Sequence, residues 1–271
     1  MEAVSAPADE RPDWVSNVVD PDQPSAARMY DYFLGGSHNF AADRELANQV
    51  LAVFPDGPLM AQANRSFLLR GVKYLHAQGV RQFLDLGSGI PSVGNVHETA
   101  PESAVVYVDI DPVAVAHSGA ILADNDRVGV VQADVRRPED VLDSPVTRGL
   151  LDFDQPIGLL TVALWHFLPD ADDPVGVLRT FRDALPAGSG LVLGHGTYDN
   201  RPDEVARAEA IYKNSANPVS SRTKAQVEPF LAGWDVTDPG LTWVVEWRPD
   251  WPPGNGDSAW CGNYGAVGWK R

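Results

Sequence analysis

The chain has 271 residues and a mass of 29.3 kDa, and 44% of its residues are hydrophobic. This size suits one α/β domain with an appendage, whose core needs no disulfide or metal ion to stabilise it. The 37 acidic and 21 basic residues give a formal net charge of -16. Nucleic acids and anionic membranes bind clustered Lys and Arg, so the composition disfavours both as partners.

Cysteine usage and apolar runs narrow the class of protein. Cys261 is the single cysteine, which excludes an internal disulfide and any multi-cysteine metal site, and we predict no metal. No apolar run reaches the roughly 18 residues of a membrane span, and the acidic N-terminus lacks the apolar core of a signal peptide. We therefore expect a cytoplasmic protein with no membrane partner.

The first third of the chain predicts a tail followed by helices. Residues 1–24 are rich in Pro, Asp and Ala without periodicity, and we expect a flexible tail. Between residues 25 and 79, apolar side chains recur at helical spacing, and Gly79 stands where a C-terminal cap belongs. We expect residues 25–79 to form a helical lid, interrupted by the glycine-containing loop 34–39.

Beyond residue 79, short apolar runs alternate with helical stretches. The expected strands cover residues 82–86, 105–108, 128–132, 157–164 and 191–195, and the expected helices cover 93–100, 112–123 and 174–185. Asp173 and Pro174 are typical of a helix N-cap and first helical position. This alternation predicts a doubly wound parallel sheet.

The last third departs from this alternation. After helices near 203–213 and 223–231, two strands at 242–247 and 266–269 follow without a helix between them, joined by the loop 248–265, so they should pair antiparallel. The expected fold is α/β: a doubly wound, mostly parallel seven-stranded sheet with an antiparallel last strand, formed by residues 80–271.

A glycine-rich turn follows the first expected strand, in FLDLGSGIPS (83–92). The glycines allow a ligand to approach the backbone closely, but Ser92 stands where a dinucleotide-binding turn has its third glycine. Asp85 would repel a pyrophosphate, whereas an ammonium group about 4 Å away would gain roughly 4 kcal/mol before desolvation. The turn therefore favours a ligand with a positive charge.

Two further strands also end in carboxylates. Asp109 lies 24 residues after Asp85, at the distance typical of a ribose-binding acid, and Asp111 stands near the start of the next helix. Asp134 follows the third strand, where it can accept from an adenine amino group. One such Asp could be a turn or helix cap, but three at successive strand ends predict a ligand site.

The motifs DLGSGIP (85–91), VDID (108–111) and ADV (133–135) resemble the cofactor motifs of class I S-adenosylmethionine-dependent methyltransferases, and TVALWHFLPD (161–170) resembles their fourth motif. The segments 27–47 and 64–75 are similar to a narrower group, the actinobacterial S-adenosyl methyltransferase family once catalogued as a domain of unknown function. With these segments the resemblance covers nearly the whole chain.

The resemblance implies S-adenosyl-L-methionine as cofactor, with the following contacts. The methionine part would lie against Asp85, Gly87, Ser88 and Gly89; the ribose against Asp109 and its neighbour Ile110; the adenine against Asp134 and Val135; and the sulfonium beside residues 163–166, beginning with Ala163. Arg28 and Arg65 are candidates for binding the cofactor carboxylate. Both could instead be surface or inter-helix ion-pair arginines.

Methyl transfer needs alignment of acceptor and methyl group, and a general base only where the acceptor loses a proton. His166 is the candidate catalytic base, although a packed histidine at a strand end is the alternative. His195, Tyr198, Asp199 and His38 are lesser candidates. The tryptophans at 243, 247, 251, 260 and 269 could form an aromatic wall, but packing of the sheet edge is the favoured interpretation.

The implied function is methyl transfer from S-adenosylmethionine to an unidentified, small-molecule acceptor. The alternatives are a non-catalytic S-adenosylmethionine-binding sensor or interaction module, and a nicotinamide-dependent oxidoreductase, against which Asp85 and Ser92 argue. The sequence predicts neither the acceptor nor the oligomeric state.

Overall fold

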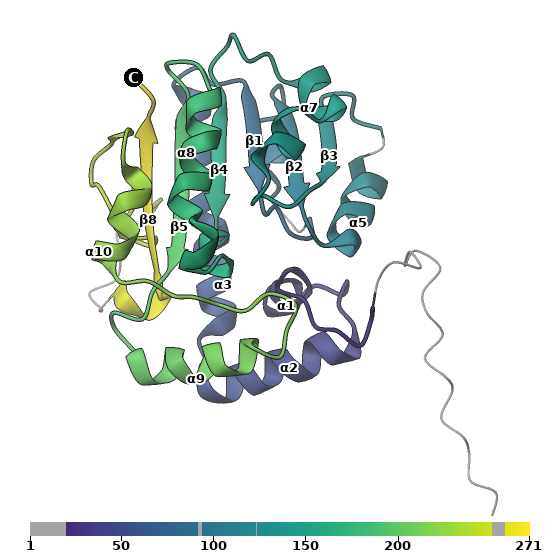
Figure 1. Cartoon of the computed structure of the whole chain (residues 1–271), viewed down its shortest axis with the longest axis vertical. Coiled ribbons are helices and arrows are strands. Elements are labelled where there is room, and N and C mark those ends of the chain that lie inside the picture. Colours follow the sequence, from purple (N-terminus) through teal and green to yellow (C-terminus); the bar gives the residue numbers. More distant parts are fainter. Residues whose placement is uncertain (1–19, 92–93, 123, 251–257) are drawn as a thin grey trace, which may run out of the picture.

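One eight-stranded sheet organises the computed structural model, which describes residues 20–91, 94–122, 124–250 and 258–271 (Figure 1). Its order is β3-β2-β1-β4-β5-β8-β6, and β7 also pairs with β8. The parallel strands are β1 (Gln82–Leu86), β2 (Ala104–Asp109), β3 (Val128–Gln132), β4 (Gly158–Val162) and β5 (Gly190–Gly196). The antiparallel edge consists of β6 (Asp235–Val236), β7 (Thr242–Trp243) and β8 (Asn263–Trp269). The doubly wound class with an antiparallel end is therefore confirmed.

The sheet has eight strands, one more than the seven predicted, and the additional strand lies at its antiparallel edge. β6 was missed because it has two residues, too few for an alternating pattern, and it pairs only with Trp269 and Gly268 of β8. The expected strand at 242–247 is reduced to β7, whereas β8 begins three residues earlier than expected. The expected strand at 157–164 ends at Val162, because Ala163 has a φ of 60° and leaves the extended conformation.

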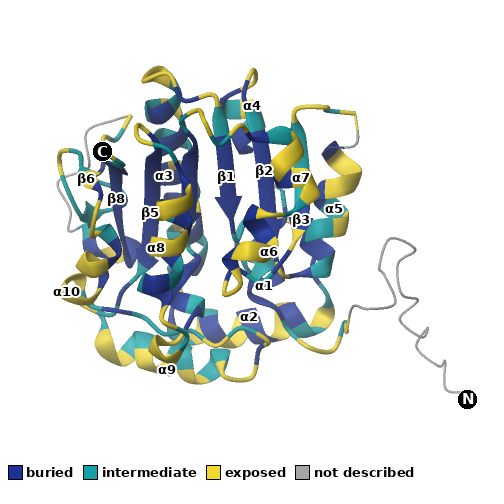
Figure 2. Ribbon diagram, turned by 45° about the horizontal axis from the view of Figure 1, so that its top comes forward, coloured by how far each residue is buried: buried dark blue, intermediate teal, exposed yellow. Residues whose placement is uncertain are grey.

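Helices cover both faces of the sheet and bury alternate side chains (Figure 2). Phe83 faces a core shared with α3 (Gly57–Ala77), α4 (Val96–Thr99) and α5 (Pro112–Leu122). Leu84 and Leu86 face the opposite core, which includes α6 (Pro138–Leu142), α7 (Pro145–Leu150), α8 (Pro174–Ala184) and α10 (Lys224–Val227). The period of two in strands places neighbouring residues on opposite faces.

Several helix boundaries follow the predicted caps. Asp173 caps α8 by accepting from the Gly176 N–H, and Gly79 follows α3 with a φ of +101°. The expected helix at 93–100 is shorter at both ends, and residue 93 lies outside the described residues. The expected helix at 223–231 is α10 followed by the 3-10 helix η3 (Glu228–Leu231).

A further layer of helices lies at the carboxyl ends of the parallel strands. It consists of α1 (Ala26–Phe33), α2 (Ala41–Val53) and α9 (Pro202–Tyr212), and α2 packs against α9 (Figure 1). The long helix α3 instead packs on the sheet: a Cβ added to Gly71 would lie 2.6 Å from the Val192 side chain of β5. Within residues 25–79, α1 and α2 therefore lie over the carboxyl ends of the strands, while α3 packs on the sheet. The expected tail lies outside the described residues up to residue 19.

Candidate active site

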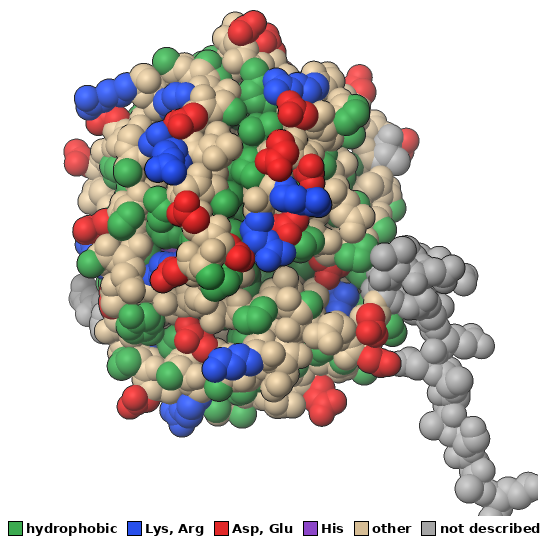
Figure 3. Space-filling view, in the orientation of Figure 1, with side chains coloured by type: hydrophobic (Ala, Val, Ile, Leu, Met, Phe, Trp, Pro, Cys, Tyr) green, Lys and Arg blue, Asp and Glu red, His purple; other side chains and the backbone are tan. Residues whose placement is uncertain are grey.

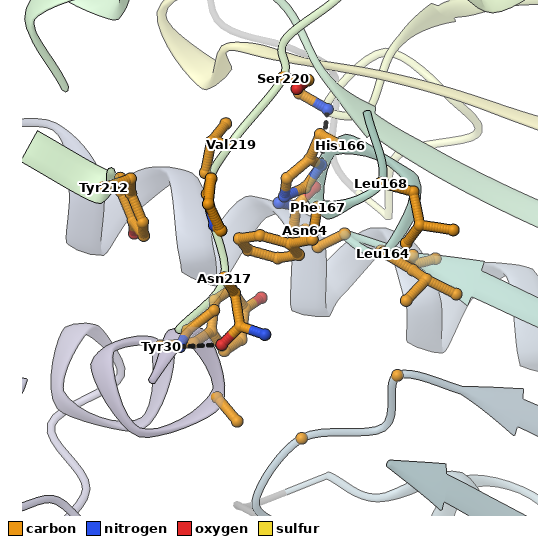
Figure 4. A pocket seen from close by; sticks show the side chains of 18 of the residues that line it. Tyr30, Asn64, Leu164, His166, Phe167, Leu168, Tyr212, Asn217, Val219 and Ser220 are labelled. Carbon is orange, nitrogen blue, oxygen red and sulfur yellow. Dashed lines mark hydrogen bonds between the residues drawn. The ribbon is translucent and has the colours of Figure 1, made fainter. Parts of the chain in front are cut away.

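A cavity of about 570 Å³ lies between the carboxyl ends of the parallel strands and the layer of α1, α2 and α9 (Figure 4). This volume falls within the ~300–1,000 Å³ typical of small-molecule sites. All of the predicted site residues except Arg28 line it: Arg65, Asp85, Gly87, Ser88, Gly89, Asp109, Ile110, Asp134, Val135, Ala163 and His166. The strand order reverses between β1 and β4, which is where such sheets bind ligands.

The turn after β1 requires its glycines. Gly87 and Gly89 have φ angles of +67° and +65°, and a Cβ on Gly87 would lie 2.7 Å from a methyl carbon of Leu164. The N–H groups of Gly87 and Ser88 donate to the Val108 carbonyl, which fixes the turn against β2. The Ser88 hydroxyl is buried and has no hydrogen-bond partner among the described residues. It is therefore available to a ligand.

Asp85 is buried at the end of β1, with 4% of its surface exposed. Burial raises the pKa of its carboxyl to about 7, an effect that Arg65 opposes and Asp109 reinforces. A buried carboxyl that titrates near neutrality lacks a full counter-charge. An ammonium group in the cavity would supply that charge and favour the ionised form.

Asp109 connects the turn after β1 to the turn after β2. Its Oδ2 accepts from the Gly89 N–H at 2.7 Å, and its Oδ1 accepts from the Asp111 N–H at 2.8 Å. Burial raises its pKa to about 6, although these same backbone hydrogen bonds lower it. A carboxylate has about four acceptor positions, so these backbone hydrogen bonds leave room for a ligand hydroxyl.

The third strand end carries an acid that already has a partner. Arg136 donates to both carboxylate oxygens of Asp134, and this hydrogen bonding lowers the pKa of Asp134. Any contact with an adenine amino group would therefore be shared with Arg136. Ile110 is 47% exposed at the cavity, and the nearby Val135 also lines it. Both offer apolar surface to a flat ring.

The two candidate arginines have different environments. Arg28 does not line the cavity: its guanidinium is buried between Asp43 at 2.8 Å and Asp111 at 3.4 Å, so the structure places it in an inter-element ion-pair network, the alternative considered from the sequence. Arg65 lines the cavity and donates to Asn95 Oδ1 at 2.9 Å. Its buried Nε has no partner among the described residues. The structure therefore leaves Arg65 as the candidate for an anionic group.

The fourth motif forms a tight turn beside the cavity. The left-handed conformation of Ala163 is rare for a residue with a Cβ, and its N–H donates to the Gly194 carbonyl. The 3-10 helix η1 (Trp165–Phe167) follows and brings His166 and Phe167 to the cavity wall (Figure 4).

His166 is poorly suited to act as a general base. Burial, aided by the nearby Arg222, lowers its pKa to about 4. Its Nδ1 accepts from the Gly196 N–H at 3.2 Å, so the proton of the neutral ring must be on Nε2. In this form the imidazole donates a hydrogen bond through Nε2, and its single acceptor is already occupied.

The four lesser candidates for a catalytic base do not line the cavity. His195 is fully buried, Tyr198 donates to Gln226, and Asp199 accepts from the Lys224 N–H at the start of α10. The His38 ring lies 3.5 Å from that of His117. No group of three or more metal-ligating side chains occurs among the described residues.

Two of the C-terminal tryptophans, Trp243 and Trp247, pack against other aromatic rings rather than line the cavity. Trp247 is buried edge-on against Phe67, Trp243 stacks on Tyr264, and neither lines the cavity. Trp260 and Trp269 are likewise absent from the lining within the described residues, and Trp251 lies outside them. The packing interpretation is the one that the structure supports.

The segment 213–222, which we call the strap, was not predicted to be part of the site. It closes one side of the cavity: the Ala216 N–H donates to the Pro24 carbonyl, Asn217 accepts from the Ala26 N–H, and the Ser220 N–H donates to the His166 carbonyl (Figure 4). The strap has no apolar periodicity, so no sequence signal marked it.

Asn64 also lines the cavity and was not predicted as a site residue. It lies on α3 with 2% of its surface exposed, and its Oδ1 has no partner among the described residues. Its sequence signal is a polar residue four positions before Leu68 and seven before Gly71, within the buried stripe of the helix.

Comparisons with known proteins agree with this fold. A DUF574 family protein from Streptomyces avermitilis is 38% identical, with a TM-score of 0.89, over 93% of this chain and 99% of that chain. A candidate methyltransferase from Thermobifida fusca is 37% identical, with a TM-score of 0.86, over 92% and 96%. The N-methyltransferase NodS from Bradyrhizobium japonicum, solved with S-adenosyl-L-homocysteine, is 15% identical with a TM-score of 0.50 over 90% and 98%, and shares the fold. A comparison with curated proteins gives no match.

The sheet and the cavity at its switch point, taken with these relatives, define a Rossmann-like methyltransferase. The chain belongs to the S-adenosyl methyltransferase family, which matches residues 12–271, and its cofactor is S-adenosylmethionine. The described residues contain no helix that is long and apolar enough to cross a membrane.

Proposed function

We propose that the chain transfers the methyl group of S-adenosylmethionine to a small-molecule acceptor bound in the same cavity. The observation that carries this proposal is the convergence of the strand-end acids, the glycine turn and Arg65 on one cavity that continues beneath α1, α2 and α9. A cavity of about 570 Å³ suits a small acceptor better than a polymer.

The residues present fit the cofactor. Three groups lack a partner or a full counter-charge: the buried Arg65 Nε, the Ser88 hydroxyl and the Asp85 carboxyl. Arg65 and Ser88 would hold the cofactor carboxylate, and Asp85 its ammonium group. Asp109 would accept from the ribose hydroxyls, and Ile110, Val135 and Asp134 would contact the adenine.

The bound cofactor supplies a methyl group that is already activated by the sulfonium charge. The task of the protein is to align the acceptor with that methyl group and to exclude water. Ala163 would form part of the wall beside the sulfonium. His166 would orient the acceptor by donating from Nε2, because its low pKa and occupied Nδ1 argue against a role as base.

The cavity beside His166 favours an enzyme over a non-catalytic binding module, since a module needs no acceptor space. A cytoplasmic location is part of the proposal. The support is that Cys261 is the single cysteine and is buried as a free thiol, because disulfides are common in secreted proteins and rare in cytosolic ones.

Titration calorimetry with S-adenosylmethionine and S-adenosylhomocysteine tests the cofactor site. We expect both to bind, and we expect Asp109→Ala to weaken binding by about 1–3 kcal/mol through lost hydrogen bonds. The matched control is Asp140→Ala, which removes an exposed carboxylate on α6. Absence of binding by the folded wild-type protein, or equal loss in both variants, would contradict the proposed site.

A further inference from the structure

The cavity has a second part whose lining differs from that of the cofactor part. We call it the apolar chamber and define it by Tyr30, Phe33, Phe54, Met60, Phe167 and Tyr212. Five of these six side chains are aromatic, and they come from α1, the end of α2, α3, η1 and α9. Phe167 contacts Tyr212 with ring centroids 6.4 Å apart, so η1 and α9 meet across it. Aromatic walls favour flat, apolar ligands.

Charged groups are scarce on this side. The lining residues from α1, α2, α3, α9 and the strap include two charged side chains, Arg65 and Glu209. Arg65 lies close enough to Asp85 to lower its pKa, on the cofactor side. Glu209 uses its Oε1 to accept from the Ser221 N–H at 2.7 Å. With Arg65 assigned to the cofactor carboxylate and Glu209 bonded to the strap, a charged ligand group in the chamber would lose its hydration without a counter-charge of its own.

Asn64, which lines the same cavity, supplies an acceptor without a partner among the described residues. Leaving its buried Oδ1 unpaired costs about 1–3 kcal/mol. Native proteins rarely leave buried polar atoms unpaired unless a ligand or water completes them. His166 adds a donor, because its proton lies on Nε2. Asn64 and His166 therefore offer one acceptor and one donor at the cavity wall (Figure 4).

We infer that the methyl acceptor is an uncharged molecule with a flat apolar ring system and a hydroxyl or N–H group that donates to Asn64 Oδ1. This inference rests on the proposed function, since it assigns the acceptor class of the same cavity. The ring would pack among the aromatic side chains of the chamber, and Asn64 would select for the donor. Transfer forms the bond between the acceptor atom and the methyl carbon and breaks the sulfur–methyl bond, which leaves S-adenosylhomocysteine. A proton lost by the acceptor goes to solvent, because the amide oxygen of Asn64 orients the donor and does not take up its proton.

Four probes of similar size test the inference: 2-naphthol, 2-methoxynaphthalene, 2-naphthoate and 2-naphthylmethylamine. Each is titrated calorimetrically into the protein saturated with S-adenosylhomocysteine. We expect 2-naphthol to bind most tightly, with an advantage of roughly 5- to 10-fold over 2-methoxynaphthalene for one hydrogen bond. The anionic and cationic probes should bind at least about tenfold more weakly, because the chamber offers no unengaged counter-charge.

Variants at Asn64 decide the role of its oxygen. Asn64→Leu and Asn64→Ala should abolish the preference for 2-naphthol over 2-methoxynaphthalene and leave the affinity for S-adenosylhomocysteine unchanged. Asn48→Leu, at an exposed position of α2, is the matched control and should keep the preference.

The outcomes separate the two proposals. Failure of S-adenosylhomocysteine to bind overturns the proposed function and this inference with it. If S-adenosylhomocysteine does bind, three results overturn this inference but leave the proposed function intact. They are that no probe binds, that a charged probe binds as tightly as 2-naphthol, or that the preference for 2-naphthol survives in both Asn64 variants.

Discussion

Asp85 is the residue whose energetics most clearly indicate a site for a cation. A carboxyl with a folded-state pKa of about 7 binds its proton more tightly in the folded than in the unfolded chain. Its contribution to stability is therefore fully present below about pH 4, near the ordinary pKa of Asp, and is lost as the pH rises toward 7. Above that pH the ligand-free protein contains an unfavourable buried charge.

Replacing Asp85 by Asn should therefore separate stability from cofactor binding. At pH 8, without ligand, Asp85→Asn should be more stable than wild type by roughly 2–4 kcal/mol, and at pH 5 the difference should shrink because Asp85 is then protonated. Denaturant unfolding at the two pH values measures this. The same variant should bind S-adenosylhomocysteine more weakly. A variant that is less stable than wild type at pH 8 would refute the assignment, and Asp140→Asn serves as the exposed control.

At the scale of single residues, the sequence predicts the acids of the site better than its cations and amides. Asp85, Asp109 and Asp134 follow strands that alternation reveals, so their convergence comes from topology. The sequence did not distinguish Arg28 from Arg65, because the partners of Arg28 at Asp43 and Asp111 meet it only in the folded chain.

Among the elements, the strap depends on one arginine that secures it to the cavity wall. The buried guanidinium of Arg222 donates to the carbonyls of Trp165 and Leu168 and pairs with Asp170 at 2.6 Å. It also donates to Nε2 of His195, whose own Nδ1 donates to the Gly196 carbonyl. Arg222 thereby fixes the turn that contains His166.

Loss of this guanidinium should destabilise the chain strongly. Arg222→Met would leave the buried Leu168 carbonyl and the His195 ring without a donor, and it would leave the Trp165 carbonyl with only the Leu168 N–H, at a cost of about 3–5 kcal/mol. Arg148→Met, in an exposed pair with Asp143, should change stability by less than about 1 kcal/mol. Urea unfolding of both variants provides the measurement, and similar losses in the two would contradict the role given to Arg222.

The predictability of elements follows their length and pattern. Strands β1 to β5 were predicted because each spans five or more residues of mainly apolar sequence, and α8 because Asp173 and Pro174 mark its start. The strap was missed because long-range hydrogen bonds, several of them from its backbone, hold it in place. Strand β6 was missed because it pairs through two residues. Such contacts leave no local pattern in the sequence.

The whole molecule carries a strong negative charge that is spread over its surface. Figure 3 shows Lys and Arg side chains interspersed with Asp and Glu on the face presented there, rather than gathered into a basic patch. The formal net charge is -16. A polyanion approaching this surface would meet net repulsion.

We therefore expect no measurable binding to duplex DNA or to RNA. Fluorescence anisotropy with labelled oligonucleotides at low salt is the most permissive test, because screening weakens any attraction as salt rises. Titratable binding that falls with salt would show a basic surface and would reopen a nucleic acid as methyl acceptor. The same assay on a basic DNA-binding protein is the positive control.

The network around Asp111 bears on how the chain can be shortened. Asp111 caps α5 by accepting from the Val113 N–H, and it also receives hydrogen bonds from Ser25 and Arg28, while Asp43 accepts from Arg28 and from the Ser25 N–H. A chain that begins after Arg28 would lack the guanidinium that pairs with Asp111, two positions after Asp109. The smallest unit suited to recombinant work therefore begins before Ser25, and a catalytic core cut at residue 80 would lose α3 from the sheet as well.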